Sequence, residues 1–242
     1  MDNIFRREAE VHFYDCDPQS RMKISAAQRL LADMADAHYA ARGMDHKWLW
    51  DNGFVFLVSR VSVQFARLPR PREVLTAETW EREIKGASFL RDFAAKDAGG
   101  GIVMTASTAW MLVDPASWQV LRPSQFPNAR PTGIAADCPP CRRLKMPGGD
   151  PAGERCVRYS DLDANGHVYN AVYSDIALDA LPEGWRQREL ARFQINFVHQ
   201  AVEGETIQLY REILDDNTVS IKGKVGDHDC FLCEFGYREM SN

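Results

Sequence analysis

The sequence is short of long apolar runs. No apolar run approaches the ~18 residues that span a bilayer, and the stretch from Met1 to Glu8 contains no apolar signal core. We therefore expect a cytoplasmic protein without a membrane span. The chain also lacks an excess of basic residues, because its formal net charge is −5. This balance argues against general nucleic-acid binding, which requires a cationic face.

Serine-hydrolase and metal chemistry are also poorly supported. The sequence contains no Gly-x-Ser-x-Gly motif, so it lacks the nucleophile elbow of a serine hydrolase. Cys138 with Cys141 and Cys230 with Cys233 have the Cys-x-x-Cys spacing of zinc ribbons. The second pair lies in a predicted strand, where side chains three positions apart point to opposite faces. Reduced structural cysteines are therefore favoured over a zinc or redox site, and we expect no metal or other cofactor.

Length and composition indicate a compact globular protein. The 242 residues fit two units or one fused domain, and 45% hydrophobic with 26% charged residues is typical of globular chains. Eight of the twelve prolines lie between Asp114 and Gly153. Proline lacks the amide donor of a central strand, so this stretch is predicted to be a linker lying across the surface. We predict an N-terminal domain over 1–114, a linker over 115–153 and a C-terminal domain over 154–242.

One short pattern occurs twice, 146 residues apart. A second block, Arg60–Phe65, matches Arg192–Phe197 at an offset of 132 residues. Two blocks in the same order indicate an internal duplication. The matched pairs of the first block are Val11 with Val157, Phe13 with Tyr159, Asp15 with Asp161, Asp17 with Asp163 and Met22 with Val168.

Each copy is predicted to contain one long helix followed by strands. Runs of strands after a single helix cannot form the right-handed crossovers of a parallel sheet, so an α+β fold is favoured. The layout is that of a double hotdog, in which two tandem antiparallel sheets each wrap a long helix and pair edge to edge. In the first copy we expect strands over 9–14, 54–65, 73–83, 88–96 and 102–113. Between the first two strands we expect a helix that is capped by Ser25, runs to about Arg42 and stops at Gly43. The buried face of this helix is predicted to consist of Ala27, Leu30, Leu31, Met34, Ala35 and Ala41. In the second copy we expect a strand ending near Tyr159, a helix from about Tyr169 to Leu181, and strands over 190–200, 205–214, 218–225 and 230–238.

The chemical candidates lie between a strand and a helix of the second copy. Asp163, Asn165 and His167 occupy alternate positions, so they are predicted to project to one side of an extended segment. The following helix end offers backbone amides and a positive dipole that can polarise a carbonyl oxygen. These three groups suit acyl transfer to water. The imidazole can take a proton from water, the carboxylate can orient the imidazole or act as the base, and the amide can fix the water or the carbonyl.

Structural roles compete with these catalytic ones. Asp at such a junction is commonly a helix cap or a turn former, and we favour that role for Asp161 and a catalytic role for Asp163. A lone His167 is commonly an exposed loop residue, and the surrounding pattern is what favours a base. In the first copy, Gln19 and Arg21 replace Asn165 and His167. Because arginine stays protonated, we expect one active centre per chain.

The second copy resembles a known family. The run from Tyr159 to Asn170, YSDLDANGHVYN, resembles the Asp-x-Asn-x-His-Val-Asn-Asn signature of acyl-acyl carrier protein thioesterases. The resemblance implies a double hotdog that hydrolyses fatty acyl thioesters and holds the acyl tail largely in its N-terminal half. Segments of the first copy that also resemble the family are Leu57–Arg60, Thr79 with Trp80, Arg91–Phe93 and Ser107–Trp110.

By the same resemblance, Asp163, Asn165 and His167 match the family's catalytic residues. A fourth family position, a Glu on the strand after the helix, falls on Gln200, which cannot act as a base. Tyr169 also replaces an expected Asn. The implied partner is an acyl carrier protein (ACP) carrying a fatty acyl phosphopantetheine thioester, and the implied products are free fatty acid and holo-ACP, ending or editing fatty acid synthesis. The chain itself is expected to be a monomer or homodimer.

Other functions stay open at this point. Hotdog proteins share thioester chemistry, so the protein is alternatively an acyl-CoA thioesterase. It is alternatively a non-catalytic acyl-binding module, since the first copy has already lost its Asn and His. A hotdog dehydratase is disfavoured, because Asp163 and His167 stand too close in one segment. Two basic runs, 67–72 and 142–145, are candidate contacts for an acidic carrier or for coenzyme A phosphates, or else solvated turns. The aromatic residues Trp48, Trp50, Phe54 and Phe56 are tunnel lining or plain core.

Overall fold

The computed structural model describes residues 3–146 and 148–239 and divides into two compact units. The first unit contains the chain up to Met22 and Arg29–Cys141, and the second contains Lys23–Gln28 and the chain from Arg142 onward. The last boundary between the units, between Cys141 and Arg142, thus falls within the proline-rich stretch. Among the described residues, no helix combines the length and the apolar character needed to cross a membrane.

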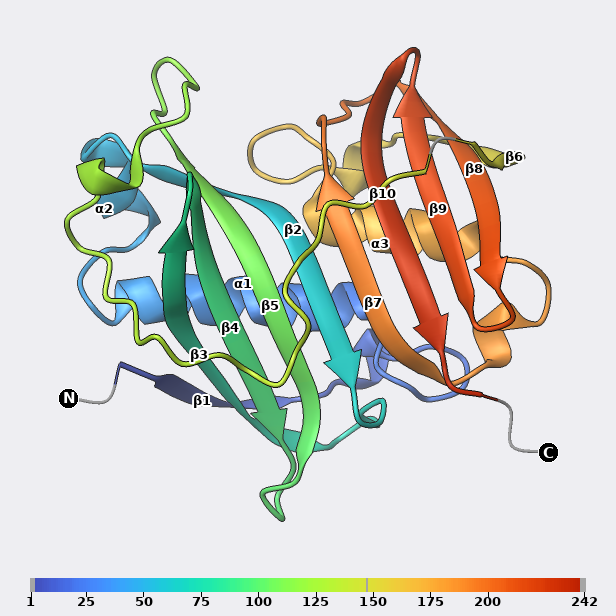
Figure 1. Cartoon of the computed structure of the whole chain (residues 1–242), viewed down its shortest axis with the longest axis horizontal. Helices are drawn as coiled ribbons and strands as arrows, with labels where there is room; N and C mark the ends of the chain where they lie inside the picture. The colour runs from blue at the N-terminus through green and yellow to red at the C-terminus, as the bar shows by residue number, and fades with distance from the viewer. Residues whose placement is uncertain (1–2, 147, 240–242) are drawn as a thin grey trace. The chain divides into compact units, whose positions relative to one another are not determined.

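The first unit is built on an antiparallel sheet in the order β1-β3-β4-β5-β2. In Figure 1, helix α1 crosses behind strands β3, β4 and β5. The elements are β1 (Phe5–Glu10), α1 (Ile24–Ala40), α2 (His46–Asp51), β2 (Val55–Phe65), β3 (Val74–Lys85), β4 (Ser88–Lys96) and β5 (Ile102–Val113), with 3-10 turns at Phe13–Asp15 and Pro123–Gln125. The first residues of α1, up to Gln28, belong to the second unit.

The second unit repeats this plan with an antiparallel sheet in the order β7-β10-β9-β8-β6. Helix α3 packs against β9 and β10 of this sheet. One helix against an antiparallel sheet in each unit confirms the predicted α+β class. The elements are β6 (Asp150–Cys156), α3 (Asn170–Asp179), β7 (Leu190–Phe197), β8 (Thr206–Asp215), β9 (Thr218–Val225) and β10 (His228–Tyr237), with 3-10 turns at Tyr159–Asp161 and Trp185–Gln187.

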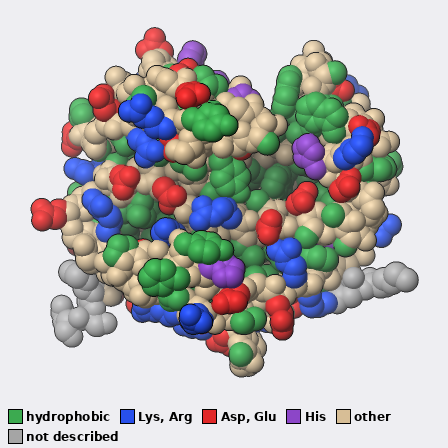
Figure 2. Space-filling model, turned by 180° about the vertical axis from the view of Figure 1, so that it is seen from behind, with side chains coloured by type: hydrophobic (Ala, Val, Ile, Leu, Met, Phe, Trp, Pro, Cys, Tyr) green, Lys and Arg blue, Asp and Glu red, His purple; other side chains and the backbone are tan. Residues whose placement is uncertain are grey.

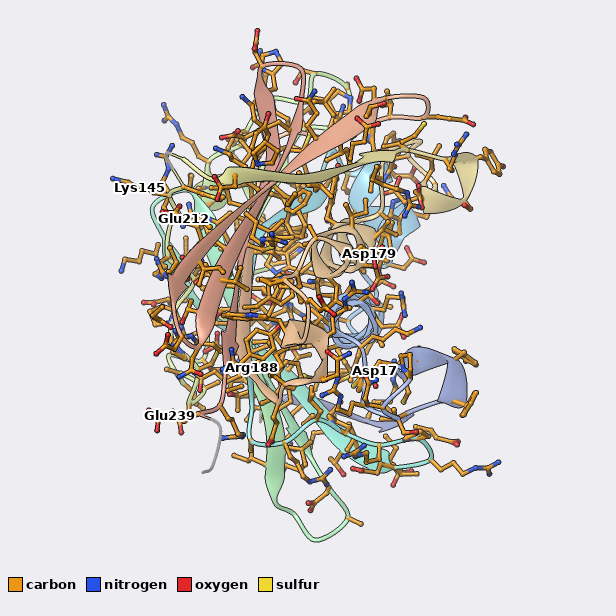
Figure 3. The ribbon with its side chains drawn as sticks, turned by 90° about the vertical axis from the view of Figure 1, so that its right-hand side faces the viewer. Asp17, Lys145, Asp179, Arg188, Glu212 and Glu239 are labelled. Carbon is orange, nitrogen blue, oxygen red and sulfur yellow. The ribbon has the colours of Figure 1, made fainter. Side chains whose placement is uncertain are left out.

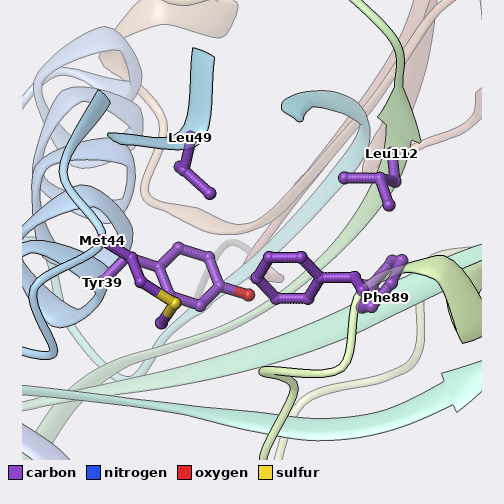
Figure 4. Packing of buried hydrophobic residues seen from close by; sticks show 6 residues of the cluster. Tyr39, Met44, Leu49, Phe89 and Leu112 are labelled. Atoms are coloured by element: carbon purple, nitrogen blue, oxygen red, sulfur yellow. The ribbon is translucent and has the colours of Figure 1, made fainter. Parts of the chain in front are cut away.

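Each unit has its own apolar core between helix and sheet. In the first unit, Tyr39 of α1 and Phe89 of β4 belong to one buried cluster that also includes Leu112 of β5 (Figure 4). In the second unit the largest fully buried side chains come from the strands and from Ile176 of α3. Each such side chain contributes about 1.5–3 kcal/mol of hydrophobic stabilisation. Those on the strands are Phe193, Ile195, Ile207, Ile221, Phe231 and Phe235.

The predicted face of α1 is largely buried, but both helix ends differ from prediction. The helix begins at Ile24, so Ser25 lies inside it and is not the cap. Ser25 is fully buried, and its hydroxyl has no hydrogen-bond partner among the described residues. The helix ends at Ala40, which leaves Ala41 exposed in the following turn. Gly43 has a φ of 76° in that turn, consistent with its predicted role as the stop.

Several other elements differ from the sequence prediction. The first strand occupies 5–10 and not 9–14, because the Asp15 carboxylate accepts a hydrogen bond from the His12 amide and folds 13–15 into a 3-10 turn. The strand predicted to end near Tyr159 ends at Cys156, and a 3-10 turn follows there as well. Helix α2, with six residues, was not predicted.

The proline-rich stretch is more ordered than a plain linker. Its last residues begin β6, where Pro151 is tolerated because β6 lies at one end of the sheet. Residues 128–141 cross the face of the first sheet opposite α1 (Figure 1). There the Ile134 carbonyl accepts from Trp80 Nε1 at 2.7 Å, and the Asp137 carbonyl accepts from Thr105 at 2.7 Å. The stretch lies across the surface as predicted, fixed by these bonds.

Candidate active site

The three predicted catalytic residues lie in one tight turn before α3. The Oδ1 atom of Asp163 accepts hydrogen bonds from the backbone amides of Asn165 at 2.8 Å and His167 at 3.4 Å. The Asp163 amide donates to the His167 carbonyl at 2.8 Å, and Gly166 has a φ of 79°. The prediction of an extended segment is therefore wrong, because Asp163 folds the chain around its own carboxylate.

The turn is anchored on both sides. Val168, which pairs with Leu162 across the base of the turn, donates its amide to the Ala201 carbonyl at 2.9 Å. On the other side, the Asp161 carboxylate accepts from the Arg158 amide at 2.8 Å and pairs with Arg155 at 2.7 Å. The prediction that Asp161 shapes the turn is thus confirmed.

The four predicted site residues come from two adjacent segments. Asp163 and His167 are half-buried and Asn165 is exposed, all in the same turn. Gln200 is exposed on the connection from β7 to β8. It neighbours Ala201, whose carbonyl binds the residue after His167, so the backbone places Gln200 beside the turn.

The arrangement suits proton transfer next to a polarising helix end. Both hydrogen bonds that the Asp163 carboxylate accepts use Oδ1, and Oδ2 has no hydrogen-bond partner among the described residues. This oxygen is available to a water molecule or an imidazole. Helix α3 begins at Asn170, one residue after the predicted start at Tyr169, so the positive end of its dipole lies next to the turn.

The first copy contains the same turn with its carboxylate occupied. Asp17 Oδ1 accepts from the amides of Gln19 and Arg21, both at 2.9 Å, and Ser20 has a φ of 56° at the position of Gly166. Asp17 is labelled in Figure 3. Its Oδ2 atom accepts from Arg21 Nε at 2.9 Å and Arg21 Nη2 at 2.8 Å. The duplicated turn is therefore closed by an ion pair where the second copy presents Asp163 and His167.

The cysteines are poorly suited to metal binding or redox chemistry. Burial raises the pKa of Cys138 to about 11 and that of Cys141 to about 12, so both thiols resist ionisation. Cys141 donates to the Ser107 carbonyl at 3.0 Å. Cys230 and Cys233 are both buried on β10, the strand predicted for them. Within residues 3–146 and 148–239, no group of three or more His, Cys, Asp or Glu side chains is placed to hold a metal ion.

The two basic runs are partly engaged in contacts within the chain. Arg67 pairs with Glu73 at 2.8 Å, and Arg70 donates to the Gln19 carbonyl at 2.7 Å. Arg142 pairs with Glu234. Basic and acidic side chains are interspersed over the face shown in Figure 2.

The candidate tunnel aromatics divide by burial. Trp48, Phe54 and Phe56 pack against the buried cluster of the first unit, whereas Trp50 is exposed. The cluster is closed by Phe126, which the sequence did not single out and which the proline-rich stretch supplies. Its buried members are Tyr39, Met44, Leu49, Phe89, Leu112 and Phe126.

The chain is similar to curated plant proteins over most of its length. The chloroplastic palmitoyl-acyl carrier protein thioesterase of Arabidopsis thaliana is 22% identical over 203 residues, which cover 77% of this chain and 49% of that protein. The protein of the same name from Cuphea hookeriana is 22% identical over 198 residues, covering 74% and 47%. The chain therefore spans about half the length of the curated relatives it matches.

Solved structures share the fold. An acyl-ACP thioesterase from Bacteroides thetaiotaomicron superposes with a TM-score of 0.89 at 19% identity, covering 98% of both chains. The 12:0-ACP thioesterase from Umbellularia californica gives a TM-score of 0.84 at 16% identity, again covering 98% of both chains. These likenesses confirm a hotdog-like α+β fold.

Two family models match the sequence itself. The model of the acyl-ACP thioesterase N-terminal domain matches residues 2–122, and that of the C-terminal domain matches residues 152–230, which contain the Asp163 turn. Together they cover most of the chain, and the protein therefore belongs to the acyl-ACP thioesterase family.

Proposed function

We propose that the protein hydrolyses fatty acyl-ACP thioesters to free fatty acid and holo-ACP, a reaction that ends or edits fatty acid synthesis. The observation that carries this proposal is the turn that gathers Asp163, Asn165 and His167 at the start of α3, within the region that matches the family's C-terminal domain. The curated relatives, which bear the name palmitoyl-acyl carrier protein thioesterase, support the same substrate class.

In the proposed reaction, water attacks the thioester carbonyl carbon. His167 takes a proton from the water, and the Asp163 carboxylate orients the imidazole or the water through Oδ2. Charge that develops on the carbonyl oxygen is stabilised by the amino end of α3. The carbon–sulfur bond then breaks, and the proton held by His167 passes to the departing pantetheine sulfur.

Asn165 and Gln200 have supporting roles in this scheme. Asn165 holds the attacking water or the thioester carbonyl through its side-chain amide. Gln200, at the position where the family carries Glu, orients a water or a neighbouring group and takes no proton. The proton chemistry therefore rests on Asp163 and His167.

We further propose that each unit is one hotdog of a tandem pair, with a division of labour between them. Residues 1–114 form the half that holds the acyl tail, and residues 154–242 form the half that performs the chemistry. The aromatic cluster of the first unit, which includes Phe56 and Phe89, supports an apolar lining for the tail. Arg21 bound to Asp17 supports a silent first copy.

The function is tested with acyl-ACPs of several chain lengths, following release of the free thiol. We expect turnover by the native chain, with kcat lowered ~10²-fold or more in His167→Ala and in Asp163→Ala and less in Asn165→Ala. Circular dichroism checks that each variant stays folded. Near-normal activity in both His167→Ala and Asp163→Ala places the chemistry elsewhere.

The same assay separates the competing functions. A higher kcat/KM for one acyl chain on coenzyme A than on ACP indicates an acyl-CoA thioesterase. Retention of intact acyl thioester through native purification, with no hydrolysis of either substrate, indicates an acyl-binding module. No turnover on any acyl-ACP or acyl-CoA overturns the proposed hydrolase.

A further inference from the structure

A buried tyrosine lies directly behind the candidate site. Tyr173 of α3 is 2% exposed, and its hydroxyl oxygen accepts a hydrogen bond from the Ala201 amide at 2.9 Å. Its ring lies 5.2 Å from the ring of Phe231 and 6.0 Å from that of Phe197. Burial raises the pKa of the phenol, so the hydroxyl stays neutral. The ring is thus fixed by packing, and its one polar atom is directed at the backbone next to Gln200.

The bond to Ala201 connects the two segments of the site. Ala201 is fully buried, and its carbonyl accepts from the Val168 amide at 2.9 Å. One residue on its N-terminal side is Gln200, and the residue before Val168 is His167. Tyr173 and Val168 therefore hold Ala201 from both sides, and the position of Gln200 relative to His167 depends on both bonds.

The first copy keeps one of these bonds and lacks the other. At the offsets of the duplication, Tyr173 corresponds to Ala27, and Ala201 corresponds to Pro69. The Pro69 carbonyl accepts from the Met22 amide at 2.8 Å, as Ala201 does from Val168. Proline has no amide to donate, and alanine has no hydroxyl to accept, so both partners of the second bond are missing.

The first copy closes its turn by a different contact. Arg70, next to Pro69, donates to the backbone carbonyls of Gln19 at 2.7 Å and Ser20 at 3.2 Å. This guanidinium lies over the turn itself, on the part that carries Asn165 in the second copy. The tyrosine contact instead fixes the second turn from within the core and leaves its polar side chains accessible. The duplicated scaffold therefore folds without the tyrosine bond, which occurs in the copy that carries Asp163, Asn165 and His167.

We propose that Tyr173 is a positioning residue for the proposed thioesterase reaction. Its hydroxyl holds the backbone of Ala201 and thereby fixes the side-chain amide of Gln200 beside His167. The inference rests on the proposed function and adds a residue and a role to it. Tyr173 does not touch the substrate in this scheme. It acts through Gln200, whose amide orients the water or the thioester carbonyl.

The test compares Tyr173→Phe with Ser174→Ala in the full chain. Tyr173→Phe removes only the hydroxyl and leaves the ring packing. Ser174, the next residue of α3, is 1% exposed and accepts from Gln28 Nε2 at 2.5 Å, so Ser174→Ala also removes one buried hydroxyl from the same helix without touching the Gln200 connection. Both variants are expected to lower the melting temperature by a similar amount, roughly 2–6 °C.

Activity is expected to separate the two variants. For Tyr173→Phe we expect kcat on acyl-ACP to fall about 10-fold or more with KM changed less than about 3-fold, since displaced site groups lower turnover. For Ser174→Ala we expect kcat within about 2-fold of the native value. When Tyr173→Phe is added to Gln200→Ala, kcat should fall less than about 2-fold below that of Gln200→Ala alone. Both changes remove the same positioning by Gln200, so their effects should not add. Equal kcat in Tyr173→Phe and the native chain, or full additivity with Gln200→Ala, overturns the proposal.

A second measurement does not depend on turnover. Hydrogen exchange over residues 198–204 is expected to be faster in Tyr173→Phe than in Ser174→Ala, because the Ala201 amide loses its acceptor. Unchanged exchange in this segment overturns the positioning role even if the native chain is an active thioesterase. If exchange is faster in Tyr173→Phe but the native chain hydrolyses no acyl thioester, both the role of Tyr173 in catalysis and the proposed function are overturned.

Discussion

The duplicated turn allows one substitution to be made in two matched places. In the first copy, Asp17→Asn keeps an oxygen that can accept from the amides of Gln19 and Arg21, but it removes the charge that binds the Arg21 guanidinium through two bonds of 2.8 and 2.9 Å. The two side chains are only 12% and 19% exposed. A charge-assisted hydrogen bond contributes about 1.5–3 kcal/mol. We therefore expect a loss of about 2 kcal/mol, or roughly 4–8 °C in melting temperature for a chain of this size.

In the second copy, Asp163→Asn is expected to give the opposite result. Asn can accept from the amides of Asn165 and His167 as Asp163 does, so the melting temperature should fall by less than about 3 °C. The carboxylate that orients His167 or the water is lost, so kcat should fall ~10²-fold or more. Differential scanning fluorimetry and thiol release on one acyl-ACP measure both variants side by side. Loss of turnover in Asp17→Asn as complete as in Asp163→Asn refutes the division between a silent and an active copy.

Two further predictions concern the first unit. Burial, and next the charge of Arg91, lower the pKa of His38 from 6.5 to about 4. Between these pH values the unfolded state binds more protons than the folded state. The free energy of unfolding should therefore fall as pH drops from about 6.5 to about 4. His38→Gln should flatten this part of a urea-unfolding series against pH, and an unchanged slope contradicts the assignment. Phe126→Ala should cost about 3–5 kcal/mol in the same assay, because the 2% exposed ring packs 5.1 Å from Phe56. Ile134→Ala, at a half-exposed position, is the control, and an equal loss there places Phe126 outside the core.

Regular, apolar elements were predictable because local sequence determines them. Strands β4, β5 and β9 lie at the predicted residues, since their apolar and β-branched runs end at turns such as Gly86 and Gly100. Helix α2 was missed because six residues are too few to show a helical period. The burial of Phe126 could not be read from a proline-rich segment without periodicity, because it depends on a core built from other parts of the chain.

The site was predictable in its residues and not in its contacts. The order of Asp163, Asn165 and His167 identified the turn, and Gly166 was a signal for a tight turn that the prediction of an extended segment ignored. The bond from Ala201 to Tyr173 joins residues 28 apart, a separation that no local pattern predicts. A tyrosine on the buried face of a helix resembles any core residue until its hydroxyl partner is known.

Strands β1 and β6, each at one end of its unit's sheet order, bear on how separate copies of the chain meet. An outer strand presents a row of unpaired amides and carbonyls on which another chain can add a strand. Strand β1 carries charges at Arg6, Arg7 and Glu8 and pairs on one side with β3. Strand β6 carries Pro151, which offers no amide, and charges at Glu154 and Arg155. These residues hinder strand addition at β1 and β6, so we expect little edge-to-edge aggregation through these two strands at high concentration.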